Sequence, residues 1–380
     1  MTGWLAARLA DGAFRLDCRV AARRPVRSGV LLVAAGGLGD LVLLAHVAHR
    51  FAALAHEGEP LTLMIRKDAA HTAFVLPPAI AVETVDFGRL GRSFAYRLAT
   101  LRRVFRAGYR LAVSLDFLRH PDLDEAIVLA ASADGTLAME ARRWPKHDRA
   151  LTRNRARFTR LYPSGDTLRD KLDRWSDFAD RLTGTAEPAG PCVLPADRRP
   201  APLDGPPTVV VQPFSAVAGK QLLPDTLAAV FDAVPPRYRI VVTGGPQDAV
   251  RNPQYGDLLL GPRVSLDLRP FTNIAPLLAS AALVISVDTA LLHLAIALGA
   301  PTLGLLSAAY VGEIVPYRPE RTPAHVRFLY HDMPCRSCLG DCRLPAEQGV
   351  FPCVARLDAD DVGSAVRQLL QRDQVAEVVR

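Results

Sequence analysis

Residues 283–306 read LVISVDTALLHLAIALGAPTLGLL, and this stretch indicates the fold most directly. Its first five residues predict a buried strand, after which comes Asp288. The run from Ala290 to Leu298 predicts a helix that begins almost at once, and the residues from Pro301 to Ser307 predict a second strand. A strand, a helix and a strand in this succession form a parallel unit whose sheet is covered on both faces.

The same alternation extends along the chain on both sides of this stretch. In the carboxy-terminal half it predicts two further strands, two further helices and a closing helix: 208–213, 238–245, 224–234, 274–282 and 359–379. In the amino-terminal half it predicts three strands and two helices: 30–35, 61–66, 111–116, 41–54 and 94–107. The sequence therefore predicts an α/β protein with parallel sheets.

A proline-rich stretch divides the chain. Residues 186–207 hold seven prolines in 22 positions, which is typical of a linker between domains. We expect an amino-terminal domain over 1–190, a carboxy-terminal domain over 208–357 and a closing helix over 358–380. Two such halves predict a ligand site in the cleft between them, at the carboxyl ends of the strands.

Composition excludes several classes of protein. Hydrophobic residues make up 49% and charged residues 22% of the 380 residues, which excludes a disordered or fibrous chain. An export signal needs an uninterrupted apolar stretch near the amino terminus. Arg8, Asp11 and Arg15 interrupt the apolar residues there, so we expect no export signal. The long uncharged run from Leu294 to Gly312 contains glycine and proline and does not read as a membrane helix. We expect a cytosolic protein.

The net charge of +7 is concentrated in one place. The stretch from Arg142 to Arg160 contains one acidic residue, Asp148, and eight basic residues: Arg142, Arg143, Lys146, Arg149, Arg153, Arg155, Arg157 and Arg160. This basic segment is either a solvated face or a surface for an anionic partner. A phosphorylated glycolipid acceptor or an anionic membrane leaflet would suit it.

The first predicted strand leads into a glycine-rich turn, Gly36-Gly37-Leu38-Gly39-Asp40. A dinucleotide fingerprint read from Gly37 and Gly39 would need a third glycine where Val42 stands. The turn instead presents one carboxylate, that of Asp40, at a helix start. Asp40 is either a helix cap or a general base, and the pattern leaves both open.

Two loops of the carboxy-terminal half suit an anionic ligand. Lys220 follows a strand as a point charge for phosphate, although Phe214 and Gln221 exclude a Walker loop. The N–H groups from Thr289 onwards open a helix and form an anion site. Asp288 would repel phosphate and suits sugar hydroxyls. His293 is either a ligand or a core residue.

Several of these stretches together resemble glycosyltransferase family 9, the heptosyltransferase family of lipopolysaccharide synthesis, from about residue 30 onwards. They are the turn at 36–40, Ser215 to Pro224, Thr243-Gly244-Gly245, Asp267-Leu268 and 286–306. The resemblance implies a GT-B fold, with two Rossmann-like domains facing each other across a cleft. It also implies an ADP-heptose donor and inverting transfer without a catalytic metal.

The resemblance also assigns roles to residues. Asp40 matches the catalytic base, and the donor is bound by Gly37, Gly39, Ser215, Lys220, Asp288, Thr289, Ala290, Leu291 and His293. Ser215 and Lys220 would hold the pyrophosphate and Asp288 the heptose. The chain departs from the family pattern at Ala290, where glycine is usual, and at Ala34-Ala35, where a basic residue is usual.

Four of the six cysteines lie close together as Cys335, Cys338, Cys342 and Cys353. Thiolates at this spacing can enclose a structural iron or zinc ion, and both metals are open. The simpler interpretation is four buried thiols. The cluster is similar to that of the autotransporter heptosyltransferases, which transfer to protein hydroxyls.

Three alternatives follow. In the first, the acceptor is a protein and not a phosphorylated glycolipid of the lipopolysaccharide core. In the second, the donor is a nucleotide sugar other than ADP-heptose. The third is a zinc-containing nucleic-acid binder, which we disfavour because the basic residues and the cysteines lie in different halves. We expect a cytoplasmic enzyme, peripheral at the inner membrane, with no nucleic-acid partner.

Overall fold

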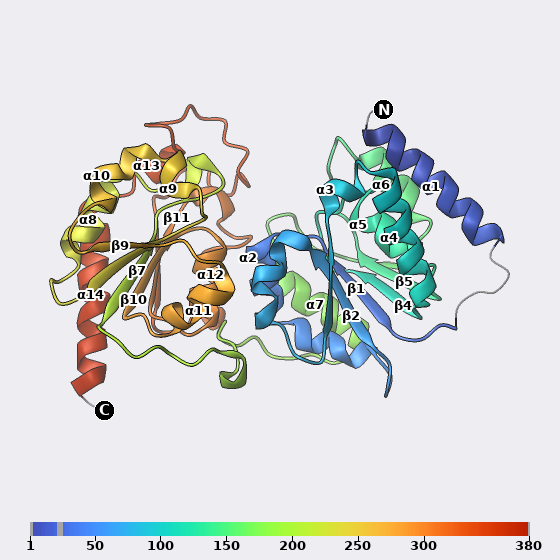
Figure 1. The fold of residues 1–380 in the computed structure, drawn as a ribbon, viewed down its shortest axis with the longest axis horizontal. Coiled ribbons are helices and arrows are strands. Elements are labelled where there is room, and N and C mark those ends of the chain that lie inside the picture. The colour runs from blue at the N-terminus through green and yellow to red at the C-terminus, as the bar shows by residue number, and fades with distance from the viewer. Residues whose placement is uncertain (1–2, 21–25, 379–380) are drawn as a thin grey trace. The chain divides into compact units, whose positions relative to one another are not determined.

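The computed structural model describes residues 3–20 and 26–378, which divide into two units. The first comprises Met1–Thr167 and Leu172–Glu187, and the second comprises Leu168–Lys171 and Pro188–Arg380. Each unit is built on its own six-stranded sheet (Figure 1), and the paired strands of both sheets run parallel. The predicted α/β class with two Rossmann-like domains is confirmed.

The first sheet has the strand order β3-β2-β1-β4-β5-β6. Its central strand β1 consists of five buried residues, as its unbroken apolar sequence requires of a strand covered on both faces. Leu31 and Val33 of β1 pack against Leu101 of helix α4 (Phe94–Ala107) and Ile127 of helix α5 (Asp124–Ala130) on one face. The strands are β1 Val30–Ala34, β2 Leu61–Arg66, β3 Ala81–Val85, β4 Leu111–Ser114, β5 Gly135–Met139 and β6 Arg160–Tyr162.

Of the α-helices of this unit, only α2 and α4 overlap the two helices that the sequence predicted. The α-helices are α1 Gly3–Val20, α2 Leu38–Leu44, α3 Phe87–Leu90, α4 Phe94–Ala107, α5 Asp124–Ala130, α6 Asp148–Arg155 and α7 Lys171–Thr183. Helix α1 packs on α4 through small residues, since Ala6, Ala7 and Ala10 are buried. Asp11 of α1 pairs with the buried Arg97 of α4 at 2.6 Å.

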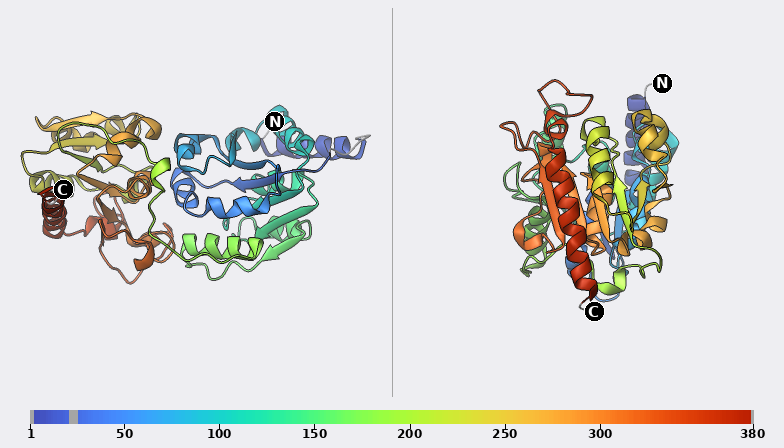
Figure 2. Two further views of the ribbon diagram at one scale, coloured as in Figure 1. Left: turned by 90° about the horizontal axis from the view of Figure 1, so that it is seen from below. Right: turned by 90° about the vertical axis from the view of Figure 1, so that its left-hand side faces the viewer.

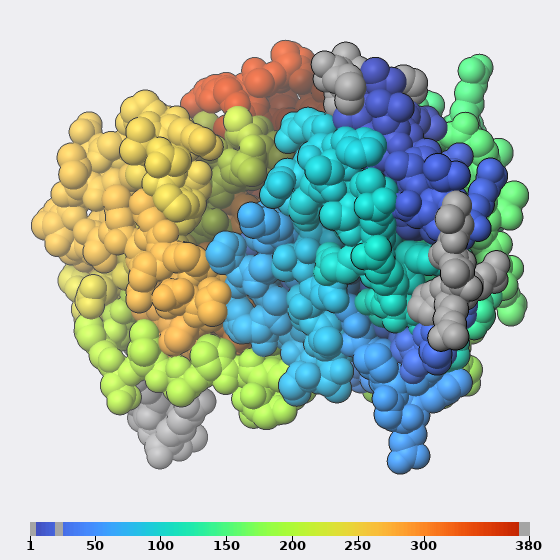
Figure 3. Space-filling model, turned by 45° about the vertical axis from the view of Figure 1, so that its right-hand side comes forward, coloured from blue at the N-terminus to red at the C-terminus, as the bar shows by residue number. Residues whose placement is uncertain are grey.

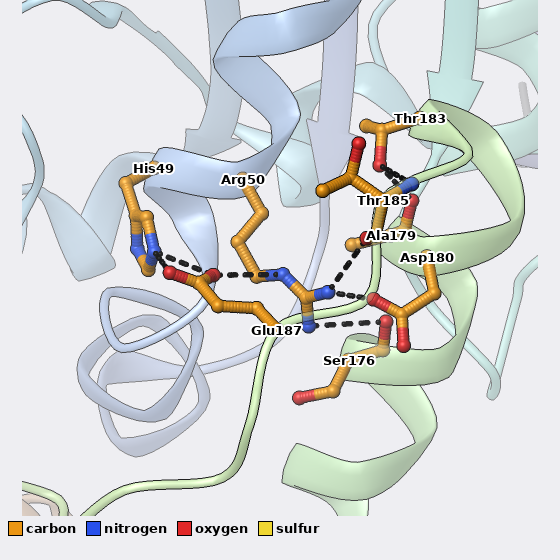
Figure 4. A network of polar contacts seen from close by, with 8 residues as sticks. All are labelled: His49, Arg50, Ser176, Ala179, Asp180, Thr183, Thr185 and Glu187. Atoms are coloured by element: carbon orange, nitrogen blue, oxygen red, sulfur yellow. Dashed lines mark hydrogen bonds and ion pairs between the residues drawn. The ribbon is translucent and has the colours of Figure 1, made fainter.

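The predicted helix 41–54 is wrong in its second half. Helix α2 ends at Leu44, and after a turn the chain continues as a 3-10 helix, Ala48–Leu54. This helix turns Arg50 inward, where the guanidinium pairs with Asp180 and donates to the carbonyl oxygens of Ser176 and Thr185, both at 3.3 Å. Figure 4 shows this network, in which Glu187 bonds both Arg50 and His49. The network anchors the last residues of the first unit.

The second sheet has the strand order β12-β11-β10-β7-β8-β9. Its strands are β7 Thr208–Gln212, β8 Arg239–Thr243, β9 Val264–Asp267, β10 Leu283–Val287, β11 Thr302–Leu306 and β12 Val326–Tyr330. Its α-helices are α8 Pro224–Ala233, α9 Asp248–Arg251, α10 Gly256–Leu259, α11 Phe271–Ala279, α12 Ala290–Ala297, α13 Pro352–Ala355 and α14 Ala359–Val378. Apolar residues of β7 and β10 share one core with α8 and α14. Figure 2 shows α14 lying along this side of the unit.

The two ends of the second unit are the proline-rich stretch and helix α14. The proline-rich stretch binds to this unit, since the N–H groups of Cys192 and Leu194 donate to the carbonyl oxygens of Arg321 and Ala297, each at 2.8 Å. Helix α14 is described as far as Val378. The last residues of the predicted closing helix, 379–380, lie outside the described residues.

Candidate functional site

The second sheet has a switch point between β10 and β7. From β7 the chain proceeds outward through β8 and β9, and from β10 it proceeds in the other direction through β11 and β12. At a switch point, the connections after two neighbouring strands run in opposite directions along the sheet. The loops that follow these strands therefore diverge, and ligands of such sheets bind between them at the carboxyl end. The loops after Gln212 and after Val287 lie at this switch point, and they carry the predicted donor-binding residues of the carboxy-terminal half.

Lys220 and Asp288 meet across this switch point. The Nζ atom of Lys220 lies 2.8 Å from the backbone oxygen and 3.1 Å from Oδ2 of Asp288. The two side chains are 12% and 5% exposed, so the pair is shielded from water. The sequence treated these residues as separate candidates 68 positions apart, and the fold makes them one charged pair.

The start of α12 lies beside this pair. Thr289 is the residue that precedes the helix, and its hydroxyl donates to Oε1 of Gln212 instead of capping α12. The hydroxyl of Ser286 donates to the same oxygen at 3.1 Å. Gln212 therefore ties the end of β7 to the end of β10 and orients the first turn of α12. The sequence did not single out Gln212.

The remaining candidates of this half occupy different positions around the switch point. The hydroxyl oxygen of Ser215 accepts from the N–H of Val217 at 3.2 Å and shapes the loop that leads to Lys220. Ala290 is partly exposed, whereas Leu291 is 1% exposed, so the side chain of Leu291 belongs to the core.

His293 is buried in the body of the unit. Its Nδ1 lies 2.6 Å from the hydroxyl of Tyr317, and the two rings are stacked with an interplanar angle of 12°. Burial raises the pKa of Tyr317 well above its ordinary value, so the phenol keeps its proton. The sequence left open whether His293 is a ligand or a core residue, and its surroundings are those of a core residue. A role of His293 in binding the donor stays a prediction.

Tyr310 is a member of the site that sequence reasoning missed. It ends a 3-10 helix, Ala308–Tyr310, that directly follows β11. The Nζ of Lys220 lies 4.9 Å from the centre of its ring, within cation–π range. The only available signal was the place of Tyr310 after a predicted strand, at the same edge of the sheet as Asp288.

Asp40 belongs to the first unit, at the corresponding switch point between β1 and β4. It is the third residue of α2, and its Oδ2 accepts from the N–H of Gly37 at 2.8 Å. A Cβ atom on Gly36 would lie 2.6 Å from Cβ of Asp40, so glycine is required for this close turn. Gly39 lies within α2. Asp40 has the capping role, and its role as base stays a prediction.

The basic segment lies on the surface of the first unit. Within α6, Leu151 and Asn154 point inward, and Asn154 donates to the buried Glu125 at 2.8 Å. Most basic side chains of the segment are exposed: Arg143, Lys146, Arg149, Arg153, Arg155, Arg157 and Arg160. Two ion pairs, of Arg155 with Glu140 and of Arg143 with Asp148, neutralise part of the charge.

The four clustered cysteines line one cavity of about 10 Å³, together with apolar groups such as Phe351 and Met333. Cys353 is buried, which raises its pKa, and its sulfur accepts from the N–H of Ala308 at 3.4 Å. Among residues 3–20 and 26–378, no group of three or more His, Cys, Asp or Glu side chains is placed to hold a metal ion. The arrangement brings the four thiols together without forming the tetrahedral ligand set that their spacing predicted.

No helix in the described part of the chain is both long and apolar enough to cross a membrane. No curated protein matches the sequence significantly. Residues 190–339 match the model of glycosyltransferase family 9 (heptosyltransferase). The matched range contains both Lys220 and Asp288.

Solved structures share the fold at low sequence identity. A family 9 glycosyltransferase from Veillonella parvula is 17% identical, with a TM-score of 0.65 over 92% of this chain and 99% of its own. The E. coli heptosyltransferase WaaC with ADP-2-deoxy-2-fluoro heptose is 18% identical, with a TM-score of 0.64 over 89% and 99%. The iron-containing dodecameric glycosyltransferase TibC of enterotoxigenic E. coli is 15% identical, with a TM-score of 0.51 over 93% and 78%.

The resemblance that the sequence indicated is thereby confirmed. Both units have the strand order of Rossmann-like domains, and the second contains the matched region with the charged pair at its switch point. Residues 190–339 of this chain form a glycosyltransferase family 9 (heptosyltransferase) domain.

Proposed function

We propose that this enzyme transfers a heptose from ADP-heptose to an acceptor hydroxyl, with inversion at the anomeric carbon. The observation that supports this most is the pair of Lys220 and Asp288 beside the start of α12, within the family 9 region. One cation, one carboxylate and a helix N-terminus match the needs of a pyrophosphate joined to a polyhydroxylated sugar.

Each group at the switch point has a role in this proposal. Lys220 and the N–H groups of the first turn of α12 bind the pyrophosphate, with Ser215 on the neighbouring loop. Asp288 accepts hydrogen bonds from hydroxyls of the sugar. Because Lys220 and Asp288 already neutralise each other, the site holds its cation in place before the donor arrives.

The transfer step requires one base. The acceptor oxygen forms a bond to the anomeric carbon while the bond from that carbon to the phosphate oxygen breaks. Asp40 takes the acceptor proton, and Lys220 with the helix N-terminus stabilises the charge that appears on ADP. A retaining reaction through a covalent intermediate would need a second carboxylate beside the sugar, whereas inversion does not.

We place the acceptor at an anionic surface such as the cytoplasmic leaflet of the inner membrane. The basic segment supplies exposed arginines. The pKa of Arg157 is lowered by desolvation and next by the like charge of Arg15 on α1. Helix α1 is thus close to the basic segment, and its outward face exposes Leu5, Leu9 and Leu16. Figure 3 shows α1 on the surface beside α4. An apolar stripe next to arginines suits a phosphorylated glycolipid in its membrane.

The cysteine cluster favours a second candidate, transfer to a protein hydroxyl as in the autotransporter branch. The supporting observation is that all four thiols line one cavity. Uptake of iron or zinc by these thiols is a separate proposal, since thiolates are ligands for both metals. Elemental analysis of freshly purified protein tests it, and a metal-free protein with titratable thiols would contradict it.

A donor screen read by mass spectrometry tests the main proposal. The enzyme is incubated with ADP-heptose, UDP-sugars and GDP-sugars, each with a phosphorylated glycolipid or a protein acceptor. Transfer from ADP-heptose to the glycolipid is expected. Transfer to protein would establish the second candidate, and use of another donor with no turnover of ADP-heptose would refute the donor assignment.

A further inference from the structure

The segment that carries the four cysteines, residues 335–353, contacts the loop that carries Lys220 and the short helix that ends at Tyr310. It is called the cysteine segment below. We propose that Tyr310 is a positioning residue for Lys220, and that the cysteine segment holds Tyr310 in place. This inference rests on the proposed role of Lys220 as the pyrophosphate ligand.

Lys220 is fixed from two directions. On one side its Nζ bonds Asp288, and on the other it lies over the ring of Tyr310, 4.9 Å from the ring centre. A lysine side chain has four rotatable bonds, and it loses this freedom whenever it must occupy one place. An aromatic face attracts the ammonium group without taking up its hydrogen bonds. Tyr310 therefore limits where Nζ can go and leaves its N–H donors for a phosphate.

Tyr310 is held in turn by the cysteine segment. The N–H of Ser337 donates to the oxygen of Ala308 at 2.9 Å, and the N–H of Leu339 donates to that of Ala309 at 2.8 Å. Together with the bond from Ala308 to the sulfur of Cys353, these contacts fasten the short helix that ends at Tyr310. Ser337 and Leu339 have positive φ angles of 67° and 57°, a strained backbone for such residues, and the contacts stabilise it.

The hydroxyl of Tyr310 lies against the backbone of Gly340. A Cβ atom placed on Gly340 would be 2.9 Å from that hydroxyl oxygen, closer than such atoms normally approach. The segment also reaches the loop of Lys220 itself, because the N–H of Phe351 donates to the oxygen of Gly219 at 2.8 Å. The same segment thus braces the ring beside Lys220 and the residue that precedes it.

Substitutions of Tyr310 test the first step, with ADP binding measured by calorimetry on the full chain. Tyr310→Leu, which removes the ring, is expected to weaken ADP binding about two- to thirty-fold, the range of a cation–π contact. Tyr310→Phe keeps the ring and is expected to bind ADP within two-fold of the wild type. Tyr330→Leu, a partly buried tyrosine of β12 in the same unit, controls for loss of a ring and is expected to leave ADP affinity unchanged.

The refuting results are distinct from failure of the proposed function. Wild-type ADP affinity in Tyr310→Leu, or equal losses in Tyr310→Leu and Tyr310→Phe, would overturn the role of the ring. In a Lys220→Met background, Tyr310→Leu is expected to cause no further loss, and a further loss of the same size would also overturn it. If Lys220→Met itself binds ADP normally, the role of Lys220 fails, whatever Tyr310 does.

Two glycines of the cysteine segment allow a controlled test of whether this segment holds Tyr310 in place. Gly340 and Gly349 have φ angles of +85° and +83°, so alanine strains the backbone equally at both. A Cβ would meet Tyr310 only at Gly340, because nothing lies within 4 Å of the position at Gly349. We expect similar losses of thermal stability, with ADP binding weakened by Gly340→Ala and unchanged in Gly349→Ala. Equal ADP affinities in the two variants would show that the segment does not position Tyr310.

Discussion

Replacing Lys220 with methionine tests the pair at the switch point directly. Methionine keeps much of the apolar stem but removes the cation, and this leaves the carboxylate of Asp288, 5% exposed, without its ammonium partner. Breaking a buried ion pair from one side costs about 3–5 kcal/mol. For a unit of this size about 1 kcal/mol shifts Tm by about 2–4 °C, so Tm should fall by about 6–20 °C.

The companion variant is Lys220→Met with Asp288→Asn. Removing both charges leaves no uncompensated ion at the switch point, so much of the lost stability is expected to return. ADP binding does not return with it, because the lost charged hydrogen bond is worth about 1.5–3 kcal/mol, or about ten- to hundred-fold in Kd. Stability and ligand affinity therefore separate in this pair of variants.

Thermal unfolding by circular dichroism and ADP calorimetry on the same samples make the measurement. Lys146→Met, an exposed lysine of the basic segment, controls for the loss of one positive charge and should change neither quantity. The reasoning is refuted if Lys220→Met unfolds at the wild-type temperature. It is also refuted if the double variant is no more stable than the single one.

Three further predictions concern the first unit. Asp40→Asn should lower the transfer rate about 10²- to 10⁴-fold while ADP affinity stays within a few-fold, and a retained kcat would contradict the assignment as base. Burial and the charge of Asp116 raise the pKa of Asp124, so the folded state binds a proton that the unfolded state releases. Stability should therefore fall as pH rises above the ordinary carboxyl pKa of 3.8, by up to about 1.4 kcal/mol per unit; urea unfolding of Asp124→Asn should lack this component, and an identical pH profile would exclude it. Reversing Arg149, Arg153 and Arg157 to glutamate should abolish sedimentation with vesicles of anionic lipid, and unchanged sedimentation would leave the segment a solvated face.

The sequence predicted the centres of both sheets better than their edges. Strands β1, β7 and β10 are buried along their whole length and mostly apolar because both faces are covered, and such runs can be recognised locally. The edge strands β3 and β9 contain few buried residues, so their sequences resemble loops, and they were not predicted. Whether a strand lies at an edge depends on strand order, which a local pattern does not contain.

Helix α1 was missed for a related reason. Its alanines pack inward and three of its leucines face outward, so the usual link between large apolar residues and burial is reversed. What makes α1 dock is its fit to α4, including the pair of Asp11 with Arg97, which are 86 positions apart. A contact at that separation cannot be predicted from periodicity.

The candidate site was predicted as separate residues and not as an arrangement. Lys220 and Asp288 were each named, but their pairing follows from the adjacency of β7 and β10. Tyr310 and Gln212 carry no motif, and only the fold brings them to these loops. The cysteines show the opposite case: their spacing predicted proximity correctly, while the geometry of a ligand set could not be predicted from spacing.

The anchoring of the chain on both sides of Pro188 has a consequence for insertions. On one side Glu187 is bound by Arg50 and His49, and on the other Cys192 is bound by Arg321. Only residues 188–191 lie between these anchor points, so Glu187 and Cys192 are joined by five residue steps and can be no more than about 18 Å apart when the chain is fully extended. Glycine and serine residues inserted here would lengthen the chain between the two anchor points, whereas the same insertion at Gly205, beyond the anchored residues, would enlarge an exposed loop and leave that stretch of chain unchanged.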